Sequence, residues 1–217
     1  LSIIHAHKGA LRWKIETEGV PAHSSTPEKG INAIYKMRRV LECIEQMAVP
    51  ALNTKSHTLL GKPTLSVGTI AGGSQVNVVP GNCVIEVDRR TIPGESEQRL
   101  TEELLGHLDQ VRALDPDLKF KIEPIEWYPS FEERTDSPVA SLVQSACDRV
   151  LGTSRFNVAP WAANSGVFKA AGIPCVLFGP GSVAQAHTRE EYIELDQVEK
   201  AVGVYAEIIR NAGAVIS

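Results

Sequence analysis

Of the six histidines in the chain, His187 lies in the sequence context that best suits chemistry. The apolar residues 174–178 predict a buried strand, and the glycines and proline at 179–181 end it and place a loop at its carboxyl end. Ligands of open α/β sheets bind at that edge, where an imidazole can coordinate a metal ion or transfer a proton. Because a zinc site normally needs three or four protein ligands, we expect His187 to be a metal ligand whose co-ligands lie mostly outside this chain.

His23 lies in the segment Ala22-His23-Ser24-Ser25-Thr26-Pro27. Hydroxyl residues followed by a proline predict a helix start at Pro27, and the amino end of a helix carries positive potential. Two interpretations of His23 stay open: it donates a hydrogen bond to an anionic oxygen of a reacting group, or it only braces the turn. His5 and His7 alternate on an expected strand, and we interpret them as solvated or hydrogen-bonded surface residues.

Two further side chains could hold a substrate. Asn77 follows a Gly-Gly-Ser turn, where an asparagine can also satisfy the turn's own backbone. Arg89 and Arg90 end an expected strand, so one of them faces each side of the sheet. An arginine at a strand end suits bidentate capture of a carboxylate, but a solvated arginine or a structural ion pair explains the same pattern.

The elements that must position these residues are predicted in the order β-α-β-β-α-β between residues 10 and 126. Alternation predicts strands near 10–18, 64–70, 84–89 and 119–126, and three- and four-residue spacing predicts helices from Pro27 to just before Pro50 and over 100–114. This order is the split βαβ pattern of a ferredoxin-like sandwich. The edge strands of such a sheet commonly pair with another copy.

In residues 127–217 the helix caps and the spacing of apolar residues predict mainly helices. A helix starts at Ser137-Pro138 and ends at Gly152, a short one covers 167–171, and Asp196 caps a last helix. That last helix has an apolar stripe that we expect to be buried: Val198, Val202, Tyr205, Ile208 and Ile209. Even with residues 1–8 added, the strands are too few for a stable sheet. Either the region borrows strands from an absent segment, or its fold differs from this prediction.

Composition excludes several classes of function. A hydrophobic content of 43% is ordinary for a globular protein, and a net charge of −4 favours neither nucleic acid nor an anionic membrane as a partner. No apolar run reaches the length of a membrane helix, and no signal peptide is visible. The four cysteines are widely spaced, which predicts reduced thiols and a cytoplasmic location. The chain does not begin with Met, which is typical of a piece of a longer protein.

Taken together, several segments resemble the M20 family of metallopeptidases and deacylases, and most closely its acetylornithine deacetylase / succinyl-diaminopimelate desuccinylase group. The segments that carry the resemblance are Ala6-His7-Lys8-Gly9, Ala22-His23-Ser24-Ser25, Gly72-Gly73, Asn77-Val78-Val79-Pro80, Asp88-Arg89-Arg90, Gly179-Pro180-Gly181 and Ala186-His187-Thr188. The resemblance implies an α+β chain. Residues 10–126 would form a lid or dimerisation domain, and residues 1–9 and 127–217 the carboxyl-terminal part of an α/β catalytic domain. The amino-terminal half of that catalytic domain, with most metal ligands, would be missing.

The resemblance also implies roles for individual residues. His187 would bind one of two zinc ions, with cobalt or manganese as alternative metals, and His23 from the opposite subunit would stabilise the oxyanion. Asn77 and Arg90 would hold the substrate, and the backbone of Gly179 and Gly181 would line the pocket. Residues 162–166, Ala-Ala-Asn-Ser-Gly, depart from the family pattern, so no substrate preference carries over.

We therefore expect part of a zinc-dependent amide hydrolase that acts on small N-acyl amino acids or dipeptides. The enzyme would be a homodimer through the lid, and the chain alone would be inactive, without bound zinc. The alternative hypothesis is a non-catalytic dimerisation or binding module.

Overall fold

The structure is a computed structural model that describes residues 1–186 and 188–213. The chain forms two compact units. One, which we call the four-stranded unit, consists of residues 8–130. The other, the three-stranded unit, consists of residues 1–7 and 131–217.

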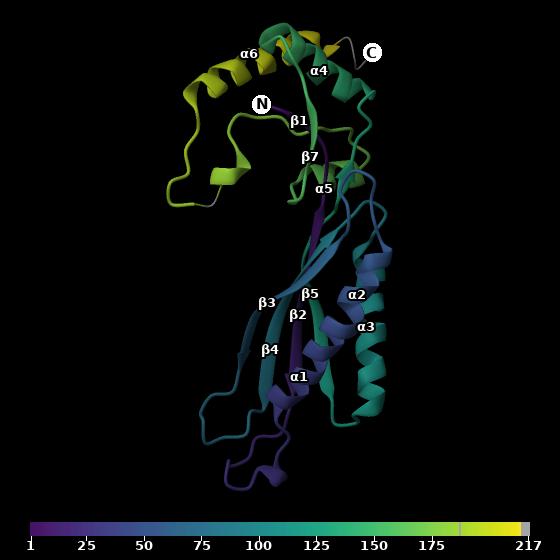
Figure 1. Cartoon of the computed structure of the whole chain (residues 1–217), viewed down its shortest axis with the longest axis vertical. Coiled ribbons are helices and arrows are strands. Elements are labelled where there is room, and N and C mark those ends of the chain that lie inside the picture. Colours follow the sequence, from purple (N-terminus) through teal and green to yellow (C-terminus); the bar gives the residue numbers. More distant parts are fainter. Residues whose placement is uncertain (187, 214–217) are drawn as a thin grey trace. The chain divides into compact units, whose positions relative to one another are not determined.

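The four-stranded unit has the β-α-β-β-α-β order that the sequence predicts. Its elements are β2 (Gly9–Glu18), α1 (Ala33–Cys43), β3 (Thr64–Gly72), β4 (Asn82–Thr91), α3 (Glu97–Leu114) and β5 (Lys119–Tyr128). The strands form an antiparallel sheet in the order β3-β4-β2-β5, so β3 and β5 are its edges. Helices α1 and α3 lie side by side against one face of this sheet (Figure 1).

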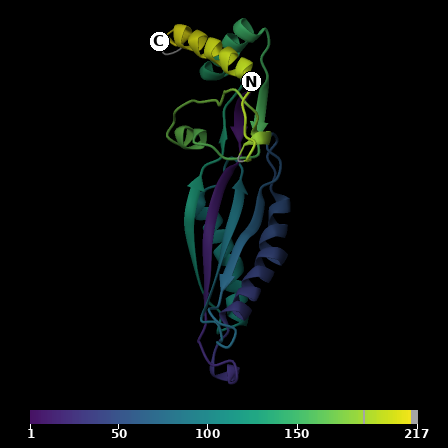
Figure 2. The same ribbon diagram turned by 90° about the vertical axis from the view of Figure 1, so that its left-hand side faces the viewer.

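The two faces of this sheet differ in chemistry because side chains alternate along each strand. Trp13, Ile15 and Ile85 point toward the helices and are buried against Met37 and Leu104. The other face, which no helix of this unit covers (Figure 2), carries charged rows. Arg12 on that face pairs with Asp88 on β4 and with Glu126 on β5. The apolar face supplies the core of the unit, and the charged face is suited to water.

The first helix departs from its predicted bounds at both ends. Pro27 starts only a 3₁₀ turn (Pro27–Lys29), and α1 begins at Ala33 because the side chain of Asn32 accepts hydrogen bonds from the backbone N–H groups of Ile34 and Tyr35. The helix also passes Pro50 instead of ending before it. A π-helical stretch (Ile44–Ala48) is followed by α2 (Val49–Ala51) and a 3₁₀ turn (Leu52–Thr54). The wider turn just before Pro50 relieves the loss of its N–H group and the clash of its ring.

The three-stranded unit has β1 (Ile3–His7) at its centre, antiparallel to β6 (Phe131–Glu132) and parallel to β7 (Phe156–Ala159). Its helices are α4 (Pro138–Leu151), α5 (Ser165–Ala170) and α6 (Leu195–Asn211), with a 3₁₀ turn at Val183–Gln185. Ser137 caps α4, and Gly152 ends it with a positive φ, as the sequence predicts. The core is small: Ile3 packs between α4 and α6, against Val143, Cys147 and Val204.

Three predictions for this unit are wrong. Residues 174–178 form no strand; Leu177 alone makes a bridge, to Ile4, and the segment is only partly buried. The last helix begins two residues earlier than expected, with Glu194 rather than Asp196 at the cap position. Val202 and Ile209 of its predicted buried stripe are exposed, because α6 meets α4 through Ala201 and Val204 instead.

Not one of the described helices is both long enough and apolar enough to cross a bilayer.

Candidate functional site

The structure brings His23 and Asn77 together at one end of the four-stranded unit. Ser24 donates its backbone N–H to the carbonyl of Asn77 at 3.0 Å, and His23 forms an isolated bridge with Val78. Both His23 and Asn77 are exposed. Two loops separated by about 50 residues in sequence therefore meet through their backbones, and both carry polar side chains at this end of the unit.

The hydrogen bonds of His23 determine which of its ring nitrogens carries hydrogen. Nδ1 accepts the backbone N–H of Ser25 at 3.2 Å and lies 2.7 Å from the hydroxyl of the same serine. A ring nitrogen that accepts a hydrogen bond from an N–H group has no proton of its own, so in the neutral imidazole the proton is on Nε2. Among the described residues nothing is bonded to Nε2. His23 is thus fixed as a hydrogen-bond donor through Nε2.

Arg90 lies at the other end of the same unit. It pairs with Ala10 and Thr64 in the strand register, whereas the beginning of β4 adjoins Gly72, next to the Asn77 loop. At about 3.4 Å per residue, the eight residues from Asn82 to Arg90 span roughly 27 Å. Arg90 is half-buried and donates from Nε to Oδ1 of Asp88 at 2.7 Å. The structure does not bring Arg90 together with His23 and Asn77.

Positive charge gathers around Arg90. Arg89 faces the opposite side of the sheet, is 2% exposed and binds Glu95 at 2.7 Å. Burial, and then the charges of Arg89 and Arg90, lower the pKa of Lys8. Lys8, Arg89 and Arg90 thus lie close together at this end of the unit, where Glu95 and Asp88 pair with the two arginines.

Gly179 and Gly181 lie in the three-stranded unit and line a hollow of about 840 Å³, together with Trp161, Phe178 and Ile193. Gly181 has φ +96°, which favours glycine, and its N–H binds Oε1 of Gln197 at 3.0 Å. His187 lies outside the described residues. The predicted metal ligand is therefore not placed by the structure, although its loop neighbour Ala186 lines the same hollow.

The prediction of surface positions for His5 and His7 is wrong, because both are buried. Nδ1 of His5 lies 3.0 Å from the carbonyl oxygen of Glu133. Nε2 of His7 lies 2.7 Å from the hydroxyl of Ser165, and the ring of His7 stacks on Trp161. Sequence reasoning did not connect His7 to Ser165, because 158 residues separate them.

Glu133 and Lys169 form a second polar pair in this unit. Glu133 is buried and lies 2.7 Å from the ammonium group of Lys169. Burial by itself would raise the pKa of Glu133, but the hydrogen bond and the charge of Lys169 outweigh it and lower that pKa. The carboxylate is therefore held ionised, as a structural anion.

The described residues do not fit a metal site. Pairs that could supply ligands occur in the sequence, such as His107 with Asp109 and Glu132 with Glu133. Residues two apart on a helix, like the first pair on α3, point in different directions. In the described part of the chain, no group of three or more His, Cys, Asp or Glu side chains could hold an ion.

The chain thus combines a split βαβ unit that carries a donor imidazole with a second unit that has a mixed sheet. The family model of the peptidase dimerisation domain of M20 proteins matches residues 5–115, and the chain belongs to this M20 family. The resemblance stated from the sequence is thereby confirmed.

Individual relatives are consistent with this assignment. The chain is 30% identical over 212 residues to the acetylornithine deacetylase of Vibrio atlanticus, and 27% identical over 211 residues to that of Myxococcus xanthus. Each match covers 96% of this chain and 54% of the relative. The chain thus spans about half the length of the curated relatives it matches.

Solved structures show the same fold. An M20 family metallo-carboxypeptidase from Sulfolobus solfataricus superposes with a TM-score of 0.69 at 18% identity, over 95% of this chain and 59% of that one. An aminopeptidase of Bacillus cereus gives 0.70 at 19% identity, over 100% of this chain and 54% of that one. At these identities the likeness concerns the fold alone.

Proposed function

We propose that this chain is part of a dinuclear zinc-dependent amide hydrolase of the M20 family. Its substrates would be small N-acyl amino acids or dipeptides. The observation that carries the proposal is the imidazole of His23, which is held with a donor N–H in a loop that is bonded to the loop of Asn77. The names of the relatives, which include deacetylases, an aminopeptidase and a metallo-carboxypeptidase, support hydrolysis of an amide bond.

In this proposal His23 donates its Nε2 hydrogen to the oxyanion that forms when the amide carbonyl is attacked. Asn77 and Arg90 bind the acyl group or carboxylate of the substrate, Arg90 by its guanidinium fork. The backbone of Gly179 and Gly181 lines the substrate pocket. His187 would be the metal ligand from this chain, and because the described residues make no metal site, we derive no metal-dependent step from them.

The distance between Arg90 and the loops of His23 and Asn77 limits how the active site can be formed in a dimer. The beginning of β4, which adjoins the loops of His23 and Asn77, lies roughly 27 Å along the sheet from Arg90, and a small N-acyl amino acid cannot span that distance. If all three bind the same substrate, His23 and Asn77 must come from one subunit and Arg90 from another. The proposed active site is therefore shared between the two chains of a homodimer.

The edges of the sheet favour β3 as the dimer contact. Strand β5 carries lysines at 119 and 121 and a proline at 124, which are features that prevent edge pairing. Strand β3, Thr-Leu-Ser-Val-Gly-Thr-Ile-Ala-Gly, has no charge and no proline. Ile70 on β3 and Tyr35 on the adjacent α1 are also exposed. Pairing of β3 with β3 of a second chain would cover this edge.

A chimaera tests the function. Residues 1–217 replace the aligned part of the Vibrio atlanticus acetylornithine deacetylase, and zinc content and hydrolysis of N-acetyl amino acids are measured. We expect zinc-dependent hydrolysis by the chimaera and none by residues 1–217 alone. His23→Ala should lower kcat by about 10²- to 10³-fold, as loss of one oxyanion donor does, while His57→Ala, at a half-buried histidine elsewhere in the unit, is the matched control. A folded, zinc-loaded chimaera that is inactive would favour a non-catalytic dimerisation module.

A further inference from the structure

Arg89 is a charged residue in the core of the four-stranded unit. Its side chain is 2% exposed and lies on the helix side of the sheet, among apolar residues that include Trp13, Leu65 and Leu104. Burial lowers the pKa of its guanidinium, and the charge of Glu95 opposes that shift. Replacing a buried ion pair by apolar side chains of similar volume often costs no stability. The position of Arg89 therefore needs an explanation other than stability.

Arg89 ties the end of β4 to the turn that follows it. Its Nη2 donates to Oε1 of Glu95 at 2.7 Å, and Oε2 of Glu95 accepts the N–H of Ile92 at 3.0 Å. The N–H of Glu95 donates to the carbonyl of Ile92 at 3.2 Å, and Gly94 has φ +91°, as a tight turn with glycine in its third position requires. The ion pair thus anchors the turn to a residue that is buried in the sheet.

The same guanidinium also holds the backbone of Arg90. Nη1 of Arg89 donates to the carbonyl oxygen of Arg90 at 3.1 Å. One planar guanidinium can serve this carbonyl and Glu95 together, because its N–H groups point in fixed and different directions. The ammonium group of a lysine is a point charge on a flexible stem, so it could keep Glu95 but not both contacts.

The side chain of Arg90 lies on the opposite, open face of the sheet. Its Nε donates to Oδ1 of Asp88 at 2.7 Å, and Oδ2 of Asp88 accepts Nε of Arg12 at 3.0 Å. Among the described residues no hydrogen bond uses Nη1 or Nη2 of Arg90. These two groups form the end of the fork that can bind a carboxylate through two parallel bonds. Their direction depends on the backbone of Arg90, which Arg89 holds.

We propose that Arg89 is a positioning residue for Arg90. It fixes the backbone of Arg90 so that the free end of the guanidinium fork on the open face receives the carboxylate of the substrate. The inference rests on the proposed function, in which Arg90 binds the substrate. Arg89 itself does not touch the substrate, because it is buried on the other side of the sheet.

The first test is a double-mutant cycle in the chimaera. Arg89→Lys keeps a buried positive charge for Glu95 and gives up the contact to the carbonyl of Arg90. With an N-acetyl amino acid as substrate, it should raise KM by about tenfold and leave kcat nearly unchanged, as loss of uniform substrate binding does. In the Arg90→Ala background it should not change KM, because both substitutions then act on one interaction.

Arg99→Lys, at an exposed site on α3, is the matched control and should leave KM unchanged in both backgrounds. An Arg89→Lys effect of equal size with and without Arg90 would overturn the proposal. So would an Arg89→Lys chimaera that keeps the KM of its parent.

The second test does not use activity. In residues 1–217 the Nε–H signal of Arg90 is identified by NMR from its absence in Arg90→Ala, and its hydrogen exchange with water is measured. Arg89→Lys should speed this exchange by about tenfold, because the end of the strand then opens more easily, and Arg99→Lys should not. Unchanged exchange in Arg89→Lys would overturn the proposal.

A second variant replaces Arg89→Lys in both tests if that chain does not fold. Arg89→Met with Glu95→Gln removes both charges of the ion pair and so leaves neither of them buried alone. An inactive chimaera combined with faster exchange in the variant would contradict the proposed function, while Arg89 would still be the residue that positions Arg90. An active chimaera whose double-mutant cycle is additive would contradict the role of Arg89 alone.

Discussion

The backbone N–H of Ser24 binds the carbonyl of Asn77 at 3.0 Å, and this bond joins the two loops that carry the candidate catalytic and substrate-binding side chains. A second bond, from the N–H of Val79 to the carbonyl of Ala22, holds the loops on the other side of His23. The imidazole and the amide are therefore positioned by backbone contacts that do not depend on either side chain. Substituting His23 or Asn77 should remove chemistry without unfolding the loops.

If each active site takes His23 from one chain and Arg90 from the other, two chimaeras that are inactive by themselves should regain activity when they form mixed dimers. In a mixed dimer of His23→Ala and Arg90→Ala chains, one site keeps both side chains and the other loses both. If dimers form at random, about a quarter of the parent activity should return on mixing. The measurement is hydrolysis before and after subunit exchange, with a mixture of two His23→Ala preparations as the control. Activity that stays at the level of the separate variants would show that His23 and Arg90 do not serve one site from two chains.

The dimer contact predicts different effects at the two sheet edges. Ile70→Lys places a charge on the uncharged edge β3, which should prevent strand pairing and yield monomers in sedimentation. Ile125→Lys makes the same change on β5, whose edge already carries lysines and Pro124, and should leave the dimer intact. The two isoleucines are 58% and 41% exposed, so neither change should disturb the core. If Ile125→Lys dissociates the dimer and Ile70→Lys does not, the dimer contact is at β5 and the prediction of a contact at β3 is wrong.

The buried contact between His7 and Ser165 predicts a loss of stability. Ser165→Ala removes the hydroxyl 2.7 Å from Nε2 of His7, a residue with no exposed surface. A buried polar atom that loses its partner costs about 1–3 kcal/mol, so the free energy of unfolding should fall by that amount in urea titration. Ser141→Ala, at an exposed position of α4, is the control and should change it by less than about 0.5 kcal/mol.

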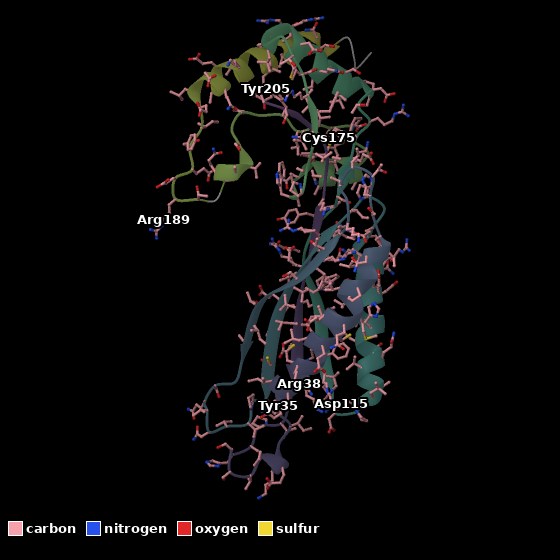
Figure 3. All side chains as sticks on the ribbon, in the orientation of Figure 1. Tyr35, Arg38, Asp115, Cys175, Arg189 and Tyr205 are labelled. Carbon is pink, nitrogen blue, oxygen red and sulfur yellow. The ribbon has the colours of Figure 1, made fainter. Side chains whose placement is uncertain are left out.

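The ion pair of Lys36 and Asp115 predicts a loss of stability in acid. The ammonium group of Lys36 lies 2.7 and 2.9 Å from the two carboxylate oxygens of Asp115, and this hydrogen bond is the main cause that lowers the pKa of Asp115. Figure 3 labels Asp115. A carboxyl whose pKa is lower in the folded state stabilises the fold above its unfolded pKa of about 3.9. That contribution is lost as the pH falls through the lowered folded value.

Asp115→Asn should therefore reduce the free energy of unfolding by about 1 kcal/mol at neutral pH and make it less dependent on pH below about 4. Urea titrations from neutral pH into acid measure both effects. Asp117→Asn, an exposed neighbour, is the control. An unchanged acid dependence in Asp115→Asn would assign the acid sensitivity to other carboxylates.

Some elements of this fold can be predicted from local sequence patterns, whereas others depend on tertiary contacts. Alternation along strands and the spacing of apolar residues predict the β-α-β-β-α-β unit from the sequence, because each of its elements buries one face against its neighbours within the unit. Caps are also local, so the bounds of α4 follow from Ser137 and Gly152. The start of α1 does not follow in this way, because Asn32 and Pro27 both carry start signals and only the fold selects Asn32.

The sequence by itself determined the family, the split βαβ unit and the identity of the candidate residues His23, Asn77 and Arg90. Only the tertiary structure decided that His23 and Asn77 lie together while Arg90 lies at the opposite end of the sheet, since that depends on strand register. It also decided that His7 is buried on Ser165 and that Val202 and Ile209 of α6 are exposed. Periodicity shows which face of a helix is apolar, but the neighbours that bury such a face are distant in sequence.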